Sequence, residues 1–503
     1  MTAAGLANTG GTISIAGNTT VGTTNQASLE VAASAPSSLP GKVSLQGDAL
    51  LQFTGTSSIQ TIGAGTSLTL DGAQSRVALS SSPTTNSALT ALSSNAGSFT
   101  VEAGASVTTV GVGLSNTGVV SVDGAGFAAG GSSLTVGGTL TNSAGATFVF
   151  GNPALGATST VQAASLSNAG TLELFGGGAT AQAALTLAGG LTNTSTVALD
   201  PTTGDPGGST MTVGGVLDND TGRLTIGNPS LSAATTVTAT GHSNTGGTIN
   251  ITGNTTAGST HQASLIVNGQ ASNAGTVNVA TNANVTVTGA GIACTQTAGS
   301  TNLSGGTLAA PNVNITGGKM QGMGTVTGAA NISATGTIEA IDLANNALPA
   351  TLINNGNYSQ SGGTFDGLLH GTGVQIDEVN VTSGHSVNLT GGDLEAFGVT
   401  FALGQVFEDI MTFQPGELTG TFATLQGGGN GTSVDLGNGL TLDAIYDNAG
   451  GDISLEVTKT VSVPAPLIGG GVPVFLAVGG ILFGAKLLER GKKRRSLGTT
   501  RHT

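Results

Sequence analysis

The sequence predicts an all-β fold: a right-handed parallel β-helix with coils of about 25 residues, a C-terminal β capping region and one transmembrane helix. Three observations carry this prediction. A short asparagine-glycine motif recurs at a nearly constant interval, each copy is followed by alternating apolar and polar residues, and the chain ends in an uncharged apolar segment with a basic cluster behind it. A fixed period of short alternating runs is typical of a solenoid, in which each repeat is one coil stacked on its neighbours.

Composition argues against the other common fold classes. The 503 residues include 85 glycines, only 8% charged and 3% aromatic residues, and no Trp. Gly, Asn, Ser and Thr interrupt almost every window of ten residues, which argues against long helices before the C-terminal tail. Val, Ile and Leu nevertheless recur regularly and the mean hydropathy is positive, which argues against a disordered chain.

The repeat has the form Leu-x-Asn-x-Gly followed by an alternating run, as in "LSNTGVVSV" (114–122) and "LSNAGTLEL" (166–174). Successive motif asparagines are separated by 26, 26, 25, 26, 25 and 29 residues. Because equivalent side chains of stacked coils lie above one another, we expect these asparagines to form a hydrogen-bonded ladder along the axis. The predicted ladder consists of Asn116, Asn142, Asn168, Asn193, Asn219, Asn244 and Asn273.

One complete unit, which starts at Leu134, shows how a coil is built. It contains three short strands separated by glycine-rich turns, and its residues Leu134, Val136, Leu140 and Phe148 alternate with Thr, Ser and Asn. Alternation is the pattern of a half-buried strand, so these four side chains are expected to point into the coil. Glycine at the turns provides positive φ angles without steric cost.

The repeat region, residues 1–355, also contains an internal duplication. Residues 9–31 and 245–267 agree at 17 of 23 positions, so the coil at residue 9 is of the interior type. Solenoids need terminal caps, and exported proteins need a signal peptide with a charged and then an apolar region. Neither pattern precedes residue 9, and we therefore expect the natural start to lie upstream.

Charge is distributed very unevenly. Residues 1–457 contain 25 of the 26 acidic residues against Lys42, Arg76, Arg223 and Lys319, a formal charge of −21. An acidic body repels phosphate backbones, so nucleic acid is not an expected partner.

Residues 356–457 hold six of the fourteen Phe and both Tyr residues and predict a bulkier capping region. Their features include Tyr358, the strand Asp377-Glu378-x-Asn380-Val381, Gly404-Gln405-x-Phe407, the run from Leu418 to Phe422, and Gly439-Leu440. This segment resembles the closing region of autotransporter-like passengers and other bacterial surface β-solenoids. The resemblance implies a cap on the coil stack.

Groups that could support catalysis are sparse. The five histidines lack metal-ligand spacing and are interpreted as surface or turn residues, and Cys294 as a buried thiol. The only calcium candidates are Asp200, Asp205, Asp218 and Asp220, for which solvated turns are the simpler interpretation; Asp377, Glu378, Asp393 and Glu395 form a second acidic group. We expect no cofactor and no enzyme activity. The alternative is a polysaccharide lyase or hydrolase, since parallel β-helices host such enzymes with clustered carboxylates.

The tail divides into a linker (458–471), a transmembrane helix (472–488) and a basic cytoplasmic end (489–503). The helix is flanked by basic residues, which are typical of the cytoplasmic side: Lys486, Arg490, Lys492, Lys493, Arg494 and Arg495. The linker contains Val463, Pro464, Ala465 and Pro466. This order resembles the PEP-CTERM sorting signal, with Ala465 in place of the usual Glu, and implies an exosortase-type sorting enzyme as a partner.

Together these features predict an exported bacterial surface or extracellular-matrix protein that is anchored or sorted through its C-terminus. Its role is expected to be adhesin-like or exopolysaccharide-associated, with polysaccharide or other cell-surface ligands and a single membrane span.

Overall fold

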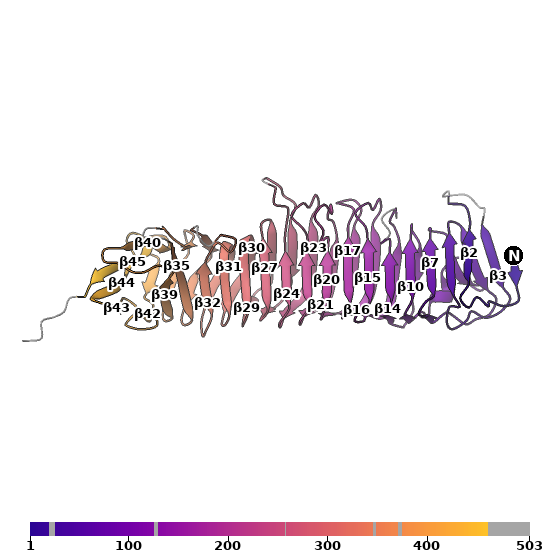
Figure 1. The fold of residues 1–503 in the computed structure, drawn as a ribbon, viewed down its shortest axis with the longest axis horizontal. Helices are drawn as coiled ribbons and strands as arrows, with labels where there is room; N and C mark the ends of the chain where they lie inside the picture. Colours follow the sequence, from indigo (N-terminus) through magenta and orange to yellow (C-terminus); the bar gives the residue numbers. More distant parts are fainter. Residues whose placement is uncertain (20–25, 125–128, 257, 346–348, 371–374, 461–503) are drawn as a thin grey trace, which may run out of the picture.

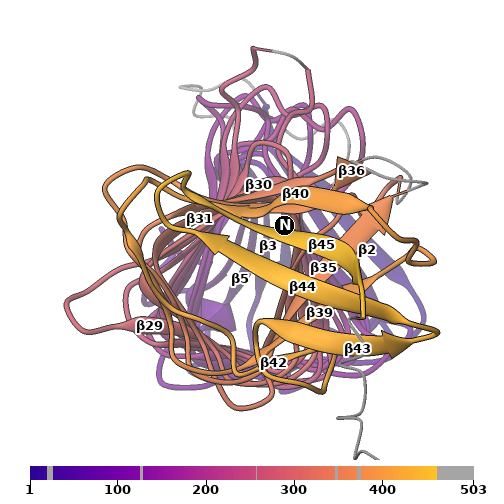
Figure 2. The same cartoon turned by 90° about the vertical axis from the view of Figure 1, so that its left-hand side faces the viewer.

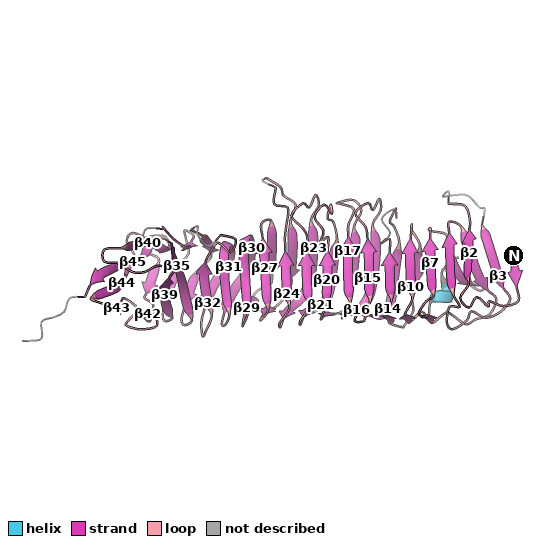
Figure 3. Ribbon diagram, in the orientation of Figure 1, coloured by secondary structure: helices cyan, strands magenta, loops and turns pink. Residues whose placement is uncertain are grey.

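A computed structural model of the chain describes residues 1–460 apart from 20–25, 125–128, 257, 346–348 and 371–374. The described residues form an elongated parallel β-solenoid (Figure 1), whose regular part comprises about 14 coils of about 26 residues. The parallel β-helix expected from the repeat is therefore confirmed. The only helical element among these residues is the short 3-10 helix η1 (Ser87–Leu89), drawn in cyan in Figure 3.

Each coil contributes strands to three faces, which we call faces A, B and C. Face A is a continuous parallel stack and begins after the motif asparagines. Its strands are β2 (Thr12–Ala16), β4 (Lys42–Gln46), β7 (Ser67–Asp71), β10 (Ser98–Glu102), β13 (Val119–Val122), β15 (Thr147–Gly151), β17 (Thr171–Phe175), β20 (Thr196–Leu199), β22 (Arg223–Ile226), β24 (Thr248–Ile251), β27 (Thr276–Ala280), the first parts of β30 (Ser300–Ile315) and β31 (Lys319–Ile332), β32 (Thr337–Ala340), β35 (Thr364–His370), β39 (Asp393–Phe397) and β42 (Thr424–Leu425).

Face B follows face A in each coil and is interrupted once. A separate four-stranded sheet comprises β1 (Thr2–Ala3), β3 (Ala27–Val31), β5 (Ala49–Phe53) and β8 (Arg76–Leu79). After a gap the face resumes with β11 (Ser106–Thr108), β14 (Ser133–Asn142), β16 (Ser159–Asn168), β18 (Ala183–Leu187), β21 (Thr210–Asn219), β23 (Thr235–Asn244), β25 (Ala263–Val267), β28 (Ala283–Val287), the middle of β30 and β31, β33 (Thr351–Asn355), β37 (Glu378–Val381) and β40 (Val406–Thr412).

Face C closes the coil and carries the motif asparagines at its end. Several long strands, among them β14 and β21, bend from face B into face C through a register shift. The remaining strands of face C are β6 (Thr61–Ile62), β9 (Ser94–Asn95), β12 (Leu114–Asn116), β19 (Leu191–Asn193), β26 (Ala271–Asn273), β29 (Ala293–Gln296), β34 (Tyr358–Gln360), β38 (Val387–Leu389) and β41 (Leu418–Gly420).

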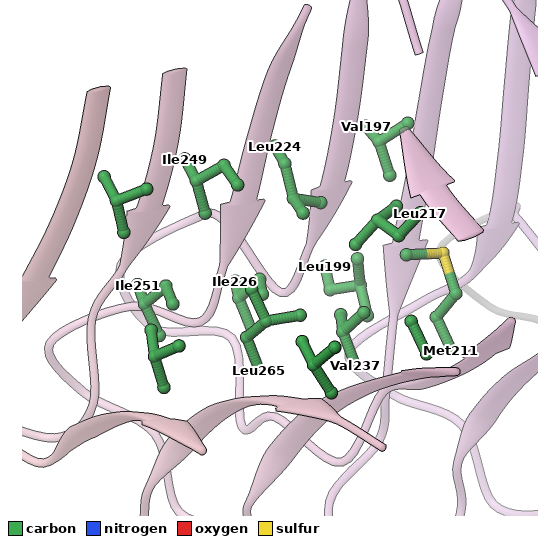
Figure 4. Packing of buried hydrophobic residues seen from close by; sticks show 14 of the residues in the cluster. Val197, Leu199, Met211, Leu217, Leu224, Ile226, Val237, Ile249, Ile251 and Leu265 are labelled. Atoms are coloured by element: carbon green, nitrogen blue, oxygen red, sulfur yellow. The ribbon is translucent and has the colours of Figure 1, made fainter. Parts of the chain in front are cut away.

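The core consists of small aliphatic side chains stacked in rows along the axis. The four positions predicted to point inward, Leu134, Val136, Leu140 and Phe148, are all buried. Figure 4 shows two such rows on face A, in which Val197, Leu224 and Ile249 lie in register beside Leu199, Ile226 and Ile251. Each fully buried Val, Leu or Ile stabilises the fold by about 1.5–3 kcal/mol, and the repeat supplies several in every coil.

The motif glycine is required by the close approach of neighbouring coils. A Cβ atom added to Gly170 would lie 2.4 Å from the carbonyl oxygen of Ala146, and one added to Gly118 would lie 2.2 Å from that of Gly97. Only glycine lets the backbones approach this closely at the turn between faces C and A.

The C-terminal end is closed by antiparallel strands (Figure 2). Coils continue past residue 356 as far as β42, while β40 pairs with β45 (Asp452–Lys459), β45 with β44 (Leu440–Asp447), and β44 with β43 (Ser433–Gly437). A further short strand, β36 (Gln375–Ile376), pairs antiparallel with β35. The closing sheet buries Phe407, Phe422, Leu442, Ile453 and Leu455.

The predicted transmembrane helix and basic end, residues 472–488 and 489–503, lie outside the described residues, as does the linker from residue 461 onward. Within the described part of the chain, no helix combines the length and apolar character needed to cross a membrane.

Candidate functional site

The predicted asparagines form a continuous buried ladder at the end of face C. The Nδ2 atom of each donates to the Oδ1 atom of the next, over distances of 2.7–2.9 Å from Asn116 to Asn273. Asn95 extends the ladder at one end and Gln296 at the other. The seven predicted asparagines are at most 4% exposed, so this ladder holds coils together and offers no surface to a ligand.

The calcium candidates do not converge. Asp200 is fully buried, and both its oxygens accept hydrogen bonds from protein donors, namely the backbone N–H of Gly176, the N–H and hydroxyl of Ser209, and the hydroxyl of Thr235. Burial raises the pKa of Asp200 despite these hydrogen bonds, which lower it. Asp123 has the same surroundings three coils earlier, with Ser132 of its own coil and Ser159 of the next coil as donors. Asp123 was not recognised from the sequence, because Ser159 lies 36 residues away.

The other three candidates lie apart from Asp200 or have their own partners. Asp205 accepts from the N–H of Thr202, and Asp220 accepts from the hydroxyl of Thr245 on face C. Asp218 belongs to the face C part of β21, in register with Ser243. Among the described residues, no group of three or more potential metal ligands is present.

Two of the histidines interpreted as surface or turn residues are partly or fully covered: His242 is buried and His370 is half-buried. His242 occupies the inward position that Leu191 and Leu217 hold in the preceding coils, and burial lowers its pKa to about 4. His370 pairs with Asp377 across 2.9 Å at the edge of face B. For His242 the surface interpretation was wrong, because its polar neighbours conceal an inward position. Cys294 lines the same small interior cavity as His242, and burial raises the pKa of its thiol to about 12.

Face A carries an outward-facing row of amides and carboxylates, which we call the outer row. Its first part is a second amide ladder, in which Asn278 donates to Asn250, Asn302 to Asn278 and Gln321 to Asn302, over 2.7–2.9 Å. In the following coils the same register positions are occupied by carboxylates. The outer row is Asn250, Asn278, Asn302, Gln321, Glu339, Asp366 and Glu395.

Lys319 joins two of these carboxylates. Its Nζ atom lies 3.0 Å from Oε2 of Glu339 and 2.9 Å from Oδ2 of Asp366. Burial raises the pKa of Glu339, which is only 3% exposed, although Lys319 opposes this shift. Burial by itself lowers the pKa of Lys319, but the hydrogen bonds to Asp366 and Glu339 outweigh it, and the net shift is upward.

The second acidic group of the sequence is thus divided between two faces. Asp393 and Glu395 lie on β39 of face A, whereas Glu378 contacts Thr412 and Asn380 on face B, and Asp377 pairs with His370. The outer row was not recognised from the sequence, because its residues are separated by irregular intervals of 18 to 29 residues. It offers amides that donate and accept hydrogen bonds, followed by acceptors, which is the chemistry of polyol recognition.

Comparison with known proteins gives no relative: neither the protein-family models nor the curated proteins contain a match to this chain.

Proposed function

We propose that this chain is an exported bacterial surface or extracellular-matrix protein, a rod anchored or sorted through its C-terminal tail, that binds polysaccharide or other cell-surface ligands and is not an enzyme. The observation that carries this proposal is the position of the chain ends. The N-terminus and β45, which leads into the tail, lie at opposite ends of the elongated stack (Figure 1). An anchor after residue 460 therefore holds one end and leaves the faces of the rod accessible.

The tail supplies the sorting part of the proposal. Val463, Pro464, Ala465 and Pro466 resemble a PEP-CTERM signal, and the apolar segment and the basic residues behind it follow in the order that an exosortase-type enzyme recognises. The body belongs outside the cytoplasm because the basic cluster stays inside. We also propose that the coils wind in the right-handed sense, as the resemblance to autotransporter passengers implies.

The outer row supports the binding part. Its polar groups repeat at the spacing of stacked strands, about 4.8 Å, so an extended polymer lying along the rod meets the same donors and acceptors coil after coil. Many weak contacts of this kind add up through multivalency.

Localisation tests the proposal. A variant that ends at residue 460 should appear in the culture medium, whereas the full chain should stay with the cells and be accessible to added protease. Truncation at residue 460 removes both the predicted helix and the basic cluster, so a full-length control keeps the helix and removes only the basic charges. In this control Gln replaces Arg490, Lys492, Lys493, Arg494 and Arg495. Retention of the shortened chain at the cell surface would contradict the anchor.

The alternative is a carbohydrate-active enzyme, and the observation that favours it is that Lys319 contacts both the buried Glu339 and Asp366. A catalytic acid needs a raised pKa, as Glu339 has. If the full chain released sugar ends from a polysaccharide and Glu339→Gln abolished this release, the enzyme interpretation would replace the structural one.

A further inference from the structure

The interruption of face B contains an open pocket. The four-stranded sheet ends at β8, and face B resumes one coil later at β11. The chain between β8 and β9 inserts a loop with η1 here, and the side chain of Asn86 takes the place of strand pairing. Its Oδ1 accepts from the N–H of Val77 at 2.7 Å, and its Nδ2 donates to the carbonyl of Ser106 at 2.7 Å. The side-chain amide of Asn86 therefore bridges the interruption of face B, and the outer side of this interruption forms the open pocket.

The pocket has a volume of about 290 Å³, and its lining is partly polar and partly apolar. This volume is close to the lower limit of about 300 Å³ for small-ligand pockets. Its lining comes from two successive coils and the inserted loop: Arg76, Thr84, Thr85, Asn86, Ser106 and Thr108. Thr84, Thr85, Ser106 and Thr108 are exposed, and Ala73 adds an apolar wall. Hydroxyl groups both donate and accept, so the lining suits a ligand that does the same.

Arg76 is the only cation of the lining and is half-buried. Its Nη2 lies 3.5 Å from Oδ1 of Asp48, and its Nη1 donates to the carbonyl of Thr84 at 3.5 Å. Both contacts are long, which leaves hydrogen-bonding capacity on the guanidinium, while its Nε is enclosed without a partner among the described residues. An unpaired buried donor destabilises the fold, and such destabilisation is typical of binding sites.

The charges at the pocket and on the whole body indicate which class of ligand the pocket can bind. Asp48, which lies outside the lining, pairs with Arg76, and residues 1–457 carry a formal charge of −21. An anionic ligand gains little from a paired guanidinium and is repelled by the body as a whole. A neutral polyol gains from the planar fork of the guanidinium and from the threonine and serine hydroxyls.

We infer that this pocket, between β8 and β11, binds one neutral sugar unit of a glycan through Arg76 and the hydroxyls of Ser106 and Thr108. The inference rests on the proposed function, because it assigns a ligand class and a place to the binding that the rod performs. Localisation of the chain does not depend on the pocket, so the proposed function and the sugar-binding inference can fail separately.

Saturation-transfer NMR tests this inference on the full chain in a detergent without a sugar head group. The probes are methyl glucoside, methyl galactoside, methyl mannoside, N-acetylglucosamine and glucuronate. We expect at least one neutral probe to bind with a dissociation constant of about 1 mM, which is ordinary for so small a ligand. Glucuronate should bind less tightly than that neutral probe.

Two variants and one matched control locate the binding. Arg76→Lys keeps the positive charge but removes the planar guanidinium group with its several N–H donors, and should weaken binding about tenfold or more. Thr108→Val removes one exposed hydroxyl and should weaken it about threefold or more. Thr212→Val changes the equivalent exposed position of β21, farther along face B, and should leave binding unchanged.

Thermal unfolding of each variant checks that the rod is intact. The inference is overturned if no neutral probe binds, if glucuronate binds more tightly than the neutral sugars, or if intact Arg76→Lys and Thr108→Val chains bind as wild type does.

Discussion

At the scale of single residues, identical side chains differ in role according to whether they point into the coil or away from it. Asn193 belongs to the buried ladder, where its amide accepts from Asn168 and donates to Asn219 and to the carbonyl of Arg223. Asn250 begins the outer row and is half-buried, with its Oδ1 accepting from Asn278. The cost of removing either amide should follow its burial, because water can replace a lost partner only at the outer position.

Asn193→Ala should therefore lower the free energy of local opening by about 2–3 kcal/mol, which corresponds to roughly 30–150-fold faster amide exchange. Native-state hydrogen exchange at the amides of β19 and β20 measures the effect. Asn250→Ala is the matched control and should cost less than about 1 kcal/mol. Equal costs at the two positions would show that the buried ladder does not stabilise the stack beyond ordinary strand pairing.

At the scale of elements, strands and ladders that repeat along the chain could be predicted from the sequence, whereas contacts and pockets formed by residues from several coils could not. The alternation around Leu134 and Phe148 and the period of the asparagines are local patterns, so the strands and the ladder follow from them directly. Asp123 could not be predicted, because its partner Ser159 is 36 residues away. His242 was misinterpreted since it replaces a leucine within an otherwise polar motif. The pocket at Arg76 combines two coils and an insertion, and no single segment encodes it.

The closing sheet is the element whose loss should change solution behaviour most. Leu455 on β45 is fully buried, whereas Ile445 on the paired strand β44 is 41% exposed. Leu455→Asp should open the cap and expose the last parallel strands, whose free edges then pair between molecules. Light scattering after size exclusion should show end-to-end association for this variant, and Ile445→Asp should remain like wild type. A monodisperse Leu455→Asp chain would mean that the closing sheet does not protect the end of the stack.

At the scale of the whole molecule, burial of carboxyl groups in an acidic rod makes stability depend on pH in an uncommon direction. Burial is the first cause of the raised pKa of each of six described acids: Asp200, Asp205, Glu339, Asp377, Glu395 and Asp409. A raised folded-state pKa means that the folded chain binds protons more tightly than the unfolded chain. This contribution to stability is complete below the ordinary values of 3.8 for Asp and 4.5 for Glu, and it is lost as pH rises through the folded-state values.

The midpoint of thermal unfolding should therefore rise by about 1–3 °C when the pH is lowered from 7.5 to about 5.5, a range that stays above the sequence pI of about 4.5. Circular dichroism at both pH values measures this shift. Repulsion among exposed acids acts in the same direction, but salt near 1 M screens it beyond about 3 Å and leaves the cost of burying a carboxylate in place. A rise that persists in salt assigns the effect to the buried groups, whereas a midpoint that falls on acidification would show that these six acids do not determine how stability depends on pH.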